Sequence, residues 1–265
     1  MGPLTLAALI CTAATALARP STFAERAARR GAPAIRLPSA SNTAAAASGT
    51  ATSGNWAGLV LEAPPSGENF TSVTGTFTVP ALANSTYTAA CAWVGIDGWA
   101  GSATDALFQA GVDFWMEDGA LAYNAWYEWV PDTSWNFTDF AVEAGDVIAL
   151  TLAAANDSAG SIAVDNKSSG QSTSIDLTAP PIPNAKTRLA LQNAEWIMED
   201  FFWYGQVPLG DFGSIQFTDA SAKTNKGTVV GLKDATVVDL ILDKKKRTET
   251  TIDSGTSATI KYLPA

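Results

Sequence analysis

The chain has 265 residues, a formal net charge of −10 at pH 7 and no histidine. Its length allows one large domain with a substantial buried core. The absence of histidine excludes Ser-His-Asp and Cys-His catalytic sites and histidine-based zinc sites, and we expect neither a metal nor another cofactor. Only two cysteines occur, Cys11 and Cys91. Because Cys11 lies in a segment that we expect to be removed, the mature protein should lack an internal disulfide.

Residues 1–18 are predicted to be a signal peptide. They form an apolar run too short to span a membrane, and the run ends in Ala16-Leu17-Ala18, a small-residue pattern that signal peptidase accepts. Arg19-Pro20 follows directly, which disfavours a buried N-terminal helix. We therefore expect a secreted, extracellular protein with no membrane-spanning helix in the rest of the chain.

Residues 19–51 form a basic segment that leads into a linker rich in Ala, Ser and Thr. The segment has five arginines and one acid, a charge of +4, whereas the residues after it carry a formal charge of −14. Opposite charges within one precursor suggest a propeptide that sits on an acidic surface of the mature protein and leaves it in acid. An ordinary disordered basic tail is the alternative. So acidic a domain is also a poor partner for nucleic acid.

Five Asn-x-Ser/Thr sequons agree with secretion, because such sites are glycosylated in loops that face solvent. The predicted glycosylation sites are Asn69, Asn84, Asn136, Asn156 and Asn166. Single sequons occur by chance, so the five together support the secretory prediction without establishing it.

Residues 52–265 are predicted to form one all-β domain. From Ser53 onward, short runs are separated by Gly, Pro, Asn and Asp, and hardly any ten-residue stretch has a helical period. Alternation of apolar and polar residues is clearest in five stretches: 73–79, 147–153, 160–165, 215–218 and 257–262. This pattern predicts an all-β sandwich.

Four segments place chemically active side chains on one face of a predicted strand, because side chains two residues apart share a face. These faces carry, in chain order, Trp93, Gly95 and Asp97; Gln109, Gly111 and Asp113; Asn124, Trp126 and Glu128; and Glu195, Ile197 and Glu199. The last segment could also be a helix, where Glu195 and Glu199 would again be neighbours, but its aromatic residues favour a strand.

The composition of these faces is unusual for the outside of an antiparallel sheet, which typically carries Thr, Ser and Lys. The four faces carry Trp, Gln, Asp and Glu, with no lysine or arginine. If the strands are neighbours, they form an acidic groove with aromatic walls, suited to a peptide or a sugar. The alternative is that each tryptophan belongs to the core and each acid is an ordinary surface residue.

Five blocks of the sequence resemble the glutamic peptidases of filamentous fungi, the eqolisins, over about residues 53–262. The blocks are 53–58, 92–98, 108–113, 125–129 and 193–201. The resemblance implies a sandwich of two long, bent antiparallel sheets, of the concanavalin A-like or jelly-roll type, with a cleft on one concave face. It also implies a catalytic dyad of Gln109 and Glu199. Phe108 and Ala110 differ from the family pattern, but alternation points both away from Gln109.

The resemblance implies a hydrolytic role for each member of the dyad. Glu199 would deprotonate water and then protonate the leaving amine, while Gln109 would donate hydrogen bonds to the oxyanion. A carboxylate base with an ordinary pKa of about 4.3 works best in acid. The sequence thus predicts a secreted acid endopeptidase. The alternatives are a glycoside hydrolase that pairs Glu128 with Glu199, and a non-catalytic lectin that stacks sugars on tryptophan.

Further residues are expected to bind substrate or to orient the dyad. Those that match family positions around the cleft are Trp93, Asp97, Asp113, Trp126 and Glu128. Trp56 is expected to line the same cleft, with core packing as the alternative. For Asp97 and Glu128 the alternative is a role as buried acids that tie loops together. The expected partners are protein or peptide substrates and the protein's own propeptide, and we expect a monomer.

Overall fold

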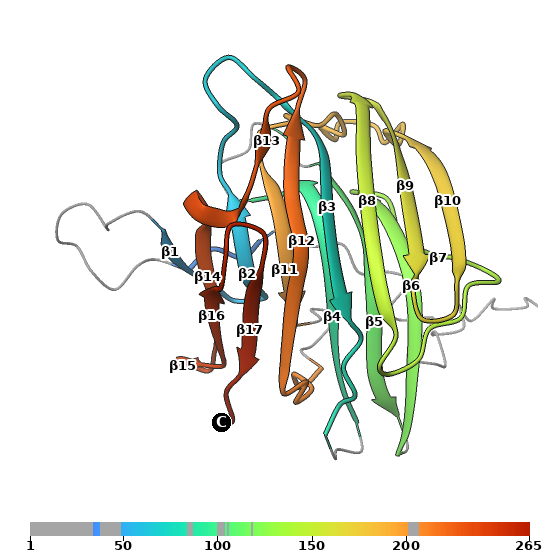
Figure 1. Cartoon of the computed structure of the whole chain (residues 1–265), viewed down its shortest axis with the longest axis vertical. Coiled ribbons are helices and arrows are strands. Elements are labelled where there is room, and N and C mark those ends of the chain that lie inside the picture. Colours follow the sequence, from blue (N-terminus) through green and yellow to red (C-terminus); the bar gives the residue numbers. More distant parts are fainter. Residues whose placement is uncertain are drawn as a thin grey trace, which may run out of the picture.

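The computed structural model describes residues 34–37, 49–83, 87–99, 104, 106–117, 119–200 and 207–265. These residues form two β-sheets that pack face to face (Figure 1). The predicted all-β sandwich is therefore confirmed. The one helical element of the described residues is a 3₁₀ turn, Leu232–Asp234, and no described helix is long and apolar enough to cross a membrane. The predicted signal peptide lies outside the described residues.

The first sheet has nine strands in the order β1-β14-β2-β11-β4-β5-β6-β7, with β15 paired to β14. All its pairings are antiparallel except that of β1 with β14. Its strands are β1 (Thr50–Ser53), β2 (Trp56–Leu61), β4 (Tyr87–Asp97), β5 (Leu107–Glu117), β6 (Ala120–Val130), β7 (Trp135–Asn136), β11 (Ala194–Glu199), β14 (Thr236–Leu242) and β15 (Lys245–Lys246). The segment 194–199, for which a helix was the alternative, is thus a strand.

The second sheet has eight strands in the order β10-β9-β8-β3-β12-β17-β16, with β13 beside β12. Its strands are β3 (Phe70–Thr78), β8 (Val147–Asn156), β9 (Ala159–Asn166), β10 (Gln171–Thr178), β12 (Ser214–Thr224), β13 (Val229–Val230), β16 (Thr248–Ile252) and β17 (Ala258–Tyr262). All five stretches of predicted alternation fall within these strands or extend one residue beyond them, because a strand that is buried on one face needs a two-residue period.

The main core fills the space between the two sheets. Phe77 and Phe217 of the second sheet pack edge to face, with ring centroids 5.4 Å apart. Trp196 of β11 reaches across from the first sheet, and its indole nitrogen donates a hydrogen bond to the carbonyl oxygen of Thr74, 2.7 Å away. Val94 and Phe108 are buried in the same cluster. Because alternate residues point inward, the intervening residues of β4, β5 and β11 must point to the opposite face.

That opposite face of the first sheet is also buried and forms a second cluster, here called the outer cluster. Its members are Trp56, Val60, Ala89, Cys91, Trp93, Trp99, Leu107, Trp115, Trp126, Val130, Ile197, Val207 and Val238. The first sheet is therefore covered on both sides, and this explains why every residue of β2 and β11 is buried. The residues with predicted catalytic roles project among these tryptophans.

The sequons differ in exposure. Asn69 and Asn156 are exposed, Asn136 is half-buried, and Asn84 lies outside the described residues. Asn166 departs from the expectation of a solvent-facing loop, because it is 1% exposed and its amide nitrogen donates to the carbonyl oxygen of Ala141 and to Asp146. In the folded chain this nitrogen is enclosed in a hydrogen-bonded turn.

Candidate active site

The four strands that carry the predicted polar faces are neighbours, in the order β11-β4-β5-β6. Residues that pair directly in an antiparallel sheet project from the same face. The register gives three rows across the outer face: Glu195, Gly95, Gln109 and Glu128; Ile197, Trp93, Gly111 and Trp126; and Glu199, Cys91, Asp113 and Asn124. The structure therefore brings together the four faces that alternation assigned, on the face away from the second sheet.

Gln109 is held by Glu128. The side-chain nitrogen of Gln109 donates a hydrogen bond to Oε2 of Glu128, 2.6 Å away, and the two residues pair directly across β5 and β6. A carboxamide nitrogen carries two hydrogens, so this bond uses one and leaves the other for a further acceptor. The bond also turns Oε1 of Gln109 away from the carboxylate. That oxygen is buried and has no hydrogen-bond partner among the described residues.

Glu199 is held by different groups. The indole nitrogen of Trp93 donates to Oε2 of Glu199 over 2.9 Å, and the amide nitrogen of Asn55 donates to Oε1 over 3.3 Å. The thiol of Cys91 lies 4.0 Å from Oε2. Glu199 is 5% exposed and Gln109 is 2% exposed, so both lie in a largely dehydrated site. Hydrogen bonds are stronger in such a site than in water.

The side chain of Trp93 extends along β4 between the levels of Gln109 and Glu199 in the sheet. Gln109 pairs with Gly95, and Glu199 pairs with Cys91, so four residues of β4 separate their levels in the sheet. The indole nitrogen of Trp93 lies at Glu199, while a Cβ at Gly95 would lie only 2.8 Å from Cζ3 of the same ring. A Cβ at Gly111 would lie 2.5 Å from Cβ of Trp93. Both glycines are therefore needed to make room for a ring that extends along β4.

The tryptophans predicted to line a cleft form one aromatic group. The rings of Trp56 and Trp93 meet edge to face with centroids 4.7 Å apart, and Trp99 stacks on Trp56 at 6.2 Å. Trp99 reaches this position because the backbone turns sharply after β4, where Asp97 and Gly98 both have positive φ. Trp126 belongs to the same outer cluster and is fully buried. Trp56 thus packs in the outer cluster, where it contacts Trp93, the residue that donates to Glu199.

Asp97 ties a loop to the sheet, which was the alternative for this residue. Its carboxylate accepts hydrogen bonds from the backbone N–H groups of Leu191, Gln192 and Asn193, at 2.8 to 3.2 Å. Burial raises the pKa of Asp97, and these backbone hydrogen bonds counteract that rise. The loop that they hold leads directly into β11, so Asp97 positions the strand that carries Glu199.

Glu195 is a buried carboxyl group that lies near Asp97. It is fully buried, and neither of its oxygens has a hydrogen-bond partner among the described residues. Burial, reinforced by the charge of Asp97, raises the pKa of Glu195 well above its ordinary value. The surroundings of Glu195 therefore favour its protonated form, whereas Glu199 on the same strand accepts hydrogen bonds.

Asp113 was predicted to bind substrate or to orient the dyad, and it lies on the same face of the sheet as Glu199. It is 1% exposed and lies in the same row as Glu199, with Cys91 between them. Its position two residues beyond Gly111 places it on the Glu199 side of Trp93. Among the described residues, no group of three or more His, Cys, Asp or Glu side chains is placed to hold a metal ion.

Asn55 is a site residue that sequence reasoning missed. It belongs to the first of the five blocks that resemble eqolisins, where it directly precedes a buried tryptophan. Asn55 is fully buried, and its amide donates to Glu199 while its carbonyl oxygen accepts from the backbone N–H of Ile35 over 2.7 Å. Its place in that block was the available signal, but no sequence pattern pairs residue 55 with residue 199.

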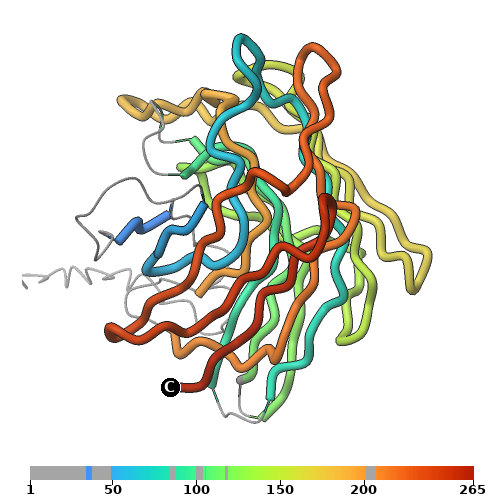
Figure 2. The backbone as a smooth tube through the Cα atoms, turned by 60° about the vertical axis from the view of Figure 1, so that its left-hand side comes forward, coloured from blue at the N-terminus to red at the C-terminus, as the bar shows by residue number. Residues whose placement is uncertain are grey.

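Residues 34–37, within the predicted propeptide, lie against this site. The N–H of Ala34 donates to the carbonyl oxygen of Gly98, and the N–H of Leu37 donates to that of Thr52. Figure 2 shows this short blue segment beside the start of β2, although the two are separated in sequence. The guanidinium carbon of Arg36 lies 5.1 Å from the ring centroid of Trp99. The segment thus contacts both the β1–β2 corner and the loop after β4.

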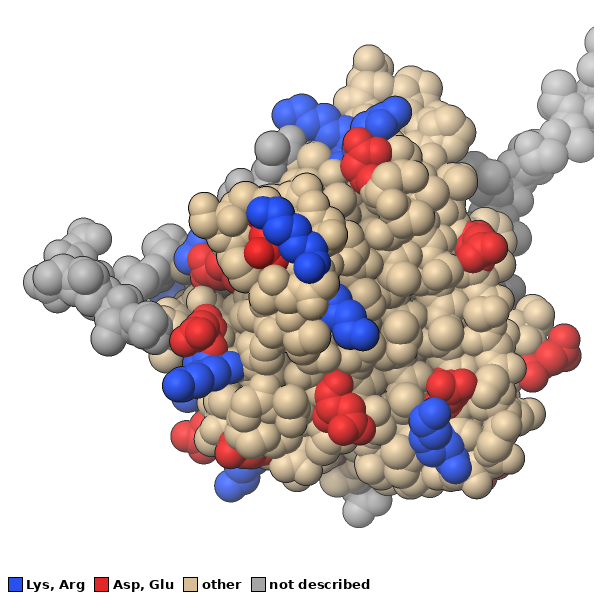
Figure 3. Space-filling view, turned by 45° about the horizontal axis from the view of Figure 1, so that its top comes forward, with Lys and Arg blue, Asp and Glu red and all other residues tan. Residues whose placement is uncertain are grey.

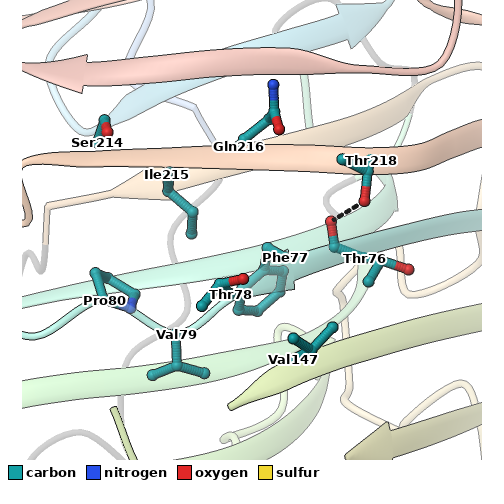
Figure 4. Close-up of a pocket in the computed structure, with 10 residues that line it drawn as sticks. All are labelled: Thr76, Phe77, Thr78, Val79, Pro80, Val147, Ser214, Ile215, Gln216 and Thr218. Atoms are coloured by element: carbon teal, nitrogen blue, oxygen red, sulfur yellow. Dashed lines mark hydrogen bonds between the residues drawn. The ribbon is translucent and has the colours of Figure 1, made fainter. Parts of the chain in front are cut away.

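A separate pocket lies on the other sheet and does not involve these residues. It has a volume of about 310 Å³ and is lined by β3, the start of β8 and β12, including Thr76, Thr78 and Gln216 (Figure 4). Its lining residues are mainly hydroxyl and aliphatic side chains, without a carboxylate. On the face drawn in Figure 3, acidic and basic residues are scattered among uncharged ones. Neither feature offers catalytic chemistry that competes with the outer face of the first sheet.

Comparison with known proteins identifies similar chains. The model of the peptidase A4 family matches residues 54–262. Aspergillopepsin-2 of Aspergillus niger is 40% identical over 232 residues, which cover 80% of this chain and 78% of that protein. Scytalidopepsin B of Scytalidium lignicola is 33% identical over 249 residues, with 91% and 90% covered.

Solved structures of similar chains share the fold. Scytalido-glutamic peptidase with a transition state analog inhibitor superposes with a TM-score of 0.69 at 32% identity, covering 79% of this chain and 98% of that one. A member of the eqolisin family in a complex with the tripeptide Ala-Ile-His gives 0.67 at 31% identity, with the same coverage. Aspergilloglutamic peptidase from Aspergillus niger gives 0.60 at 44% identity, covering 66% and 99%.

Proposed function

The chain belongs to the peptidase A4 family and is a glutamic peptidase, and on that premise we propose that it cleaves peptide bonds in acid with Gln109 and Glu199 as its catalytic residues. The observation that carries the proposal is the Trp93 indole, which binds Glu199 at one end and lies over Gly95, the pairing partner of Gln109, at the other. A carboxylate and a carboxamide thus face the same aromatic surface. Each is oriented by its own hydrogen bonds.

In the proposed reaction Glu199 takes a proton from a water molecule, and the oxygen of that water attacks the carbonyl carbon of the scissile peptide. The carbonyl oxygen becomes an oxyanion, to which Gln109 donates the hydrogen that Glu128 leaves free. Glu199 then gives its proton to the amide nitrogen, the C–N bond breaks, and the amine leaves. A carboxamide does not titrate, so Gln109 can act as a donor throughout the acidic range.

The arrangement gives less support to the two alternatives. A glycoside hydrolase would need Glu128 as a second catalytic carboxyl group, yet Glu128 accepts a 2.6 Å hydrogen bond from Gln109. A lectin would need exposed aromatic faces for stacking on sugars, whereas Trp56, Trp93 and Trp126 are fully buried. The proposed peptide hydrolysis keeps the hydrogen bond between Gln109 and Glu128, which orients Gln109.

We further propose that the protein is secreted as a precursor and that residues 19–51 act as a propeptide. The described part of that segment lies against the candidate site. Residues 34–36 read Ala-Ile-Arg, and so they share their first two residues with the tripeptide Ala-Ile-His in the complex of the eqolisin family member. This likeness supports a role for the segment as a ligand of the protein's own site.

Activity assays on defined substrates test the proposed function. Purified protein is incubated at acid pH with acid-denatured protein and, in parallel, with a panel of polysaccharides. We expect new amino termini from the protein substrate and no reducing sugar from the polysaccharides. The Glu199→Gln chain serves as the control and should release neither. Sugar release that depends on Glu199 would replace the peptidase assignment with the glycosidase one.

A further inference from the structure

Residues 34–37 pair with the β1–β2 corner as an added antiparallel strand. Arg36 is the bridge partner of Ser53, the carbonyl oxygen of Ile35 accepts from the N–H of Gly54 over 2.8 Å, and the N–H of Leu37 donates to the carbonyl oxygen of Thr52 over 3.0 Å. The hydroxyl of Ser53 also lies 3.1 Å from the carbonyl oxygen of Ile35.

All of these contacts use only the main chain of the added segment. Any extended peptide could make them, which is how an open strand edge recognises peptides without regard to their sequence. The side chains of Ile35 and Arg36 are exposed, so they contribute little burial to the contact. The corner formed by residues 52–55 is thus a general binding edge for a peptide backbone.

Asn55 connects this edge to the catalytic carboxylate. Its side-chain oxygen accepts from the N–H of Ile35 over 2.7 Å, and its side-chain nitrogen donates to Oε1 of Glu199 over 3.3 Å. An amide is suited to this position because it has an acceptor at one end and a donor at the other. A peptide backbone on the edge therefore lies one side chain away from Glu199.

A second feature selects a side chain. The guanidinium of Arg36 lies 5.1 Å from the ring centroid of Trp99, within the range of a cation–π contact. Trp99 is 2% exposed and is held by its stacking on Trp56. Arg36 makes no ion pair among the described residues, and its charged group contacts the ring of Trp99.

We propose that residues 52–55 and Trp99 form a substrate subsite that binds the main chain of an extended peptide with a cationic side chain over Trp99, and that residues 34–37 occupy this subsite in the precursor. The inference rests on the proposed peptidase function and specifies which peptides the site takes. Asn55 acts as a positioning residue, because it holds the bound backbone and Glu199 in one hydrogen-bonded arrangement.

The first experiment measures displacement and does not require catalysis. The full-length Glu199→Gln chain is mixed with increasing concentrations of the capped peptide Ala-Ile-Arg-Leu, and hydrogen exchange is followed at the amides of Ile35 and Leu37. We expect the peptide to speed exchange at both amides, with a midpoint several-fold lower than that of Ala-Ile-Gln-Leu. Unchanged exchange at saturating peptide would show that the peptide does not use this edge and would overturn the proposal.

The second experiment measures release of the subsite within the full chain. Ile35→Pro removes the N–H that donates a hydrogen bond to Oδ1 of Asn55, and Arg36→Ala removes the cation over Trp99. Initial rates on a fluorogenic peptide, taken in acid before the chain is cleaved, should rise about three- to tenfold in each variant, as expected for the loss of one hydrogen bond or one cation–π contact. Arg247→Ala is the matched control, since Arg247 stacks on Tyr262 at 5.5 Å far from the site, and it should not raise the rate.

The third experiment tests side-chain selection in the Ile35→Pro chain. Peptides that carry a single arginine or glutamine at successive positions are compared by KM and kcat. At one position arginine should lower KM severalfold with little change in kcat, and Trp99→Ala should abolish that difference. Peptide hydrolysis without any such position would overturn the subsite while leaving the peptidase function intact. If no variant cleaves peptides, the proposed function fails, and the exchange experiment still decides whether the subsite exists.

Discussion

The indole nitrogen of Trp93 donates a 2.9 Å hydrogen bond to Oε2 of Glu199, and the two residues come from adjacent strands that are separated by about a hundred positions in sequence. This bond fixes one carboxylate oxygen and leaves the other beside Asn55. The indole therefore orients the proposed general base through its N–H, in addition to packing in the outer cluster.

Trp93→Phe should lower kcat about tenfold or more at a nearly unchanged KM, with some loss of stability. The variant keeps an aromatic ring over Gly95 but loses the N–H that orients Glu199, and hydrogen bonds to charged groups contribute about 1.5–3 kcal/mol. Steady-state kinetics in acid provide the measurement. Trp196→Phe is the matched control, because it removes a buried indole hydrogen bond on the other face of the same sheet. That control should lose stability but retain kcat.

Glu199→Gln and Gln109→Ala should each reduce peptide hydrolysis by about a hundredfold or more, because one removes the general base and the other the oxyanion donor. Circular dichroism should show an intact β-rich fold in both. Glu195→Gln should retain much more activity, since Glu195 has no assigned role in the reaction. An essential Glu195 with a dispensable Glu199 would mean that the general base has been assigned to the wrong glutamate.

Glu195 should make the protein less stable as the pH rises above its ordinary pKa of 4.5. Its pKa is raised in the folded state, so the unfolded chain ionises first, and stability that is complete below pH 4.5 is lost as the pH rises toward the folded pKa. The loss approaches about 1.4 kcal/mol per pH unit over that window. Asp97, whose pKa is also raised, acts in the same direction.

Urea unfolding of the wild-type chain and of Glu195→Gln between pH 4 and pH 7 measures this contribution. The variant keeps the shape of the side chain but cannot ionise, so its stability should depend less on pH. The difference between the two proteins should grow in favour of the variant as the pH rises. A difference that stays constant across the range would show that Glu195 ionises equally in both states.

Gly111→Ala should destabilise the fold and reduce activity, because the added Cβ would lie 2.3 Å from the carbonyl oxygen of Ala92 and 2.5 Å from Cβ of Trp93. Overpacking of this kind typically costs about 1–3 kcal/mol. Thermal unfolding measures the loss. Gly255→Ala provides a matched control, since its Cβ would meet nothing within 4 Å. Equal melting temperatures for the two variants would contradict the close packing around Trp93.

Activity should be insensitive to metal chelators and to inhibitors that target paired aspartates, because the proposed reaction uses one carboxylate and a carboxamide. Rates are compared before and after prolonged treatment with a chelator in acid, with a zinc peptidase treated in parallel. Loss of activity that added metal restores would contradict the mechanism.

Much of this protein follows from its sequence alone. The two-residue alternation in segments such as 147–153 determines a strand, because a sheet with one buried face repeats every two residues. The same period assigned Gln109 and Asp113 to one face, and Glu195 and Glu199 to another, since the geometry of a single strand is local. The resemblance of five blocks then indicated the family and the catalytic pair.

Tertiary structure decided which faces meet and which groups touch. Strand order and register depend on contacts between distant segments, so only the folded chain places Trp93 beside Glu199 and Glu128 beside Gln109. The two carboxyl groups of β11 look alike in sequence, yet Glu199 accepts hydrogen bonds from Trp93 and Asn55, while Glu195 is buried with no hydrogen-bond partner among the described residues. This difference separates their chemistry. Asn55 became a site residue only when the chain brought its amide between Glu199 and the backbone of Ile35.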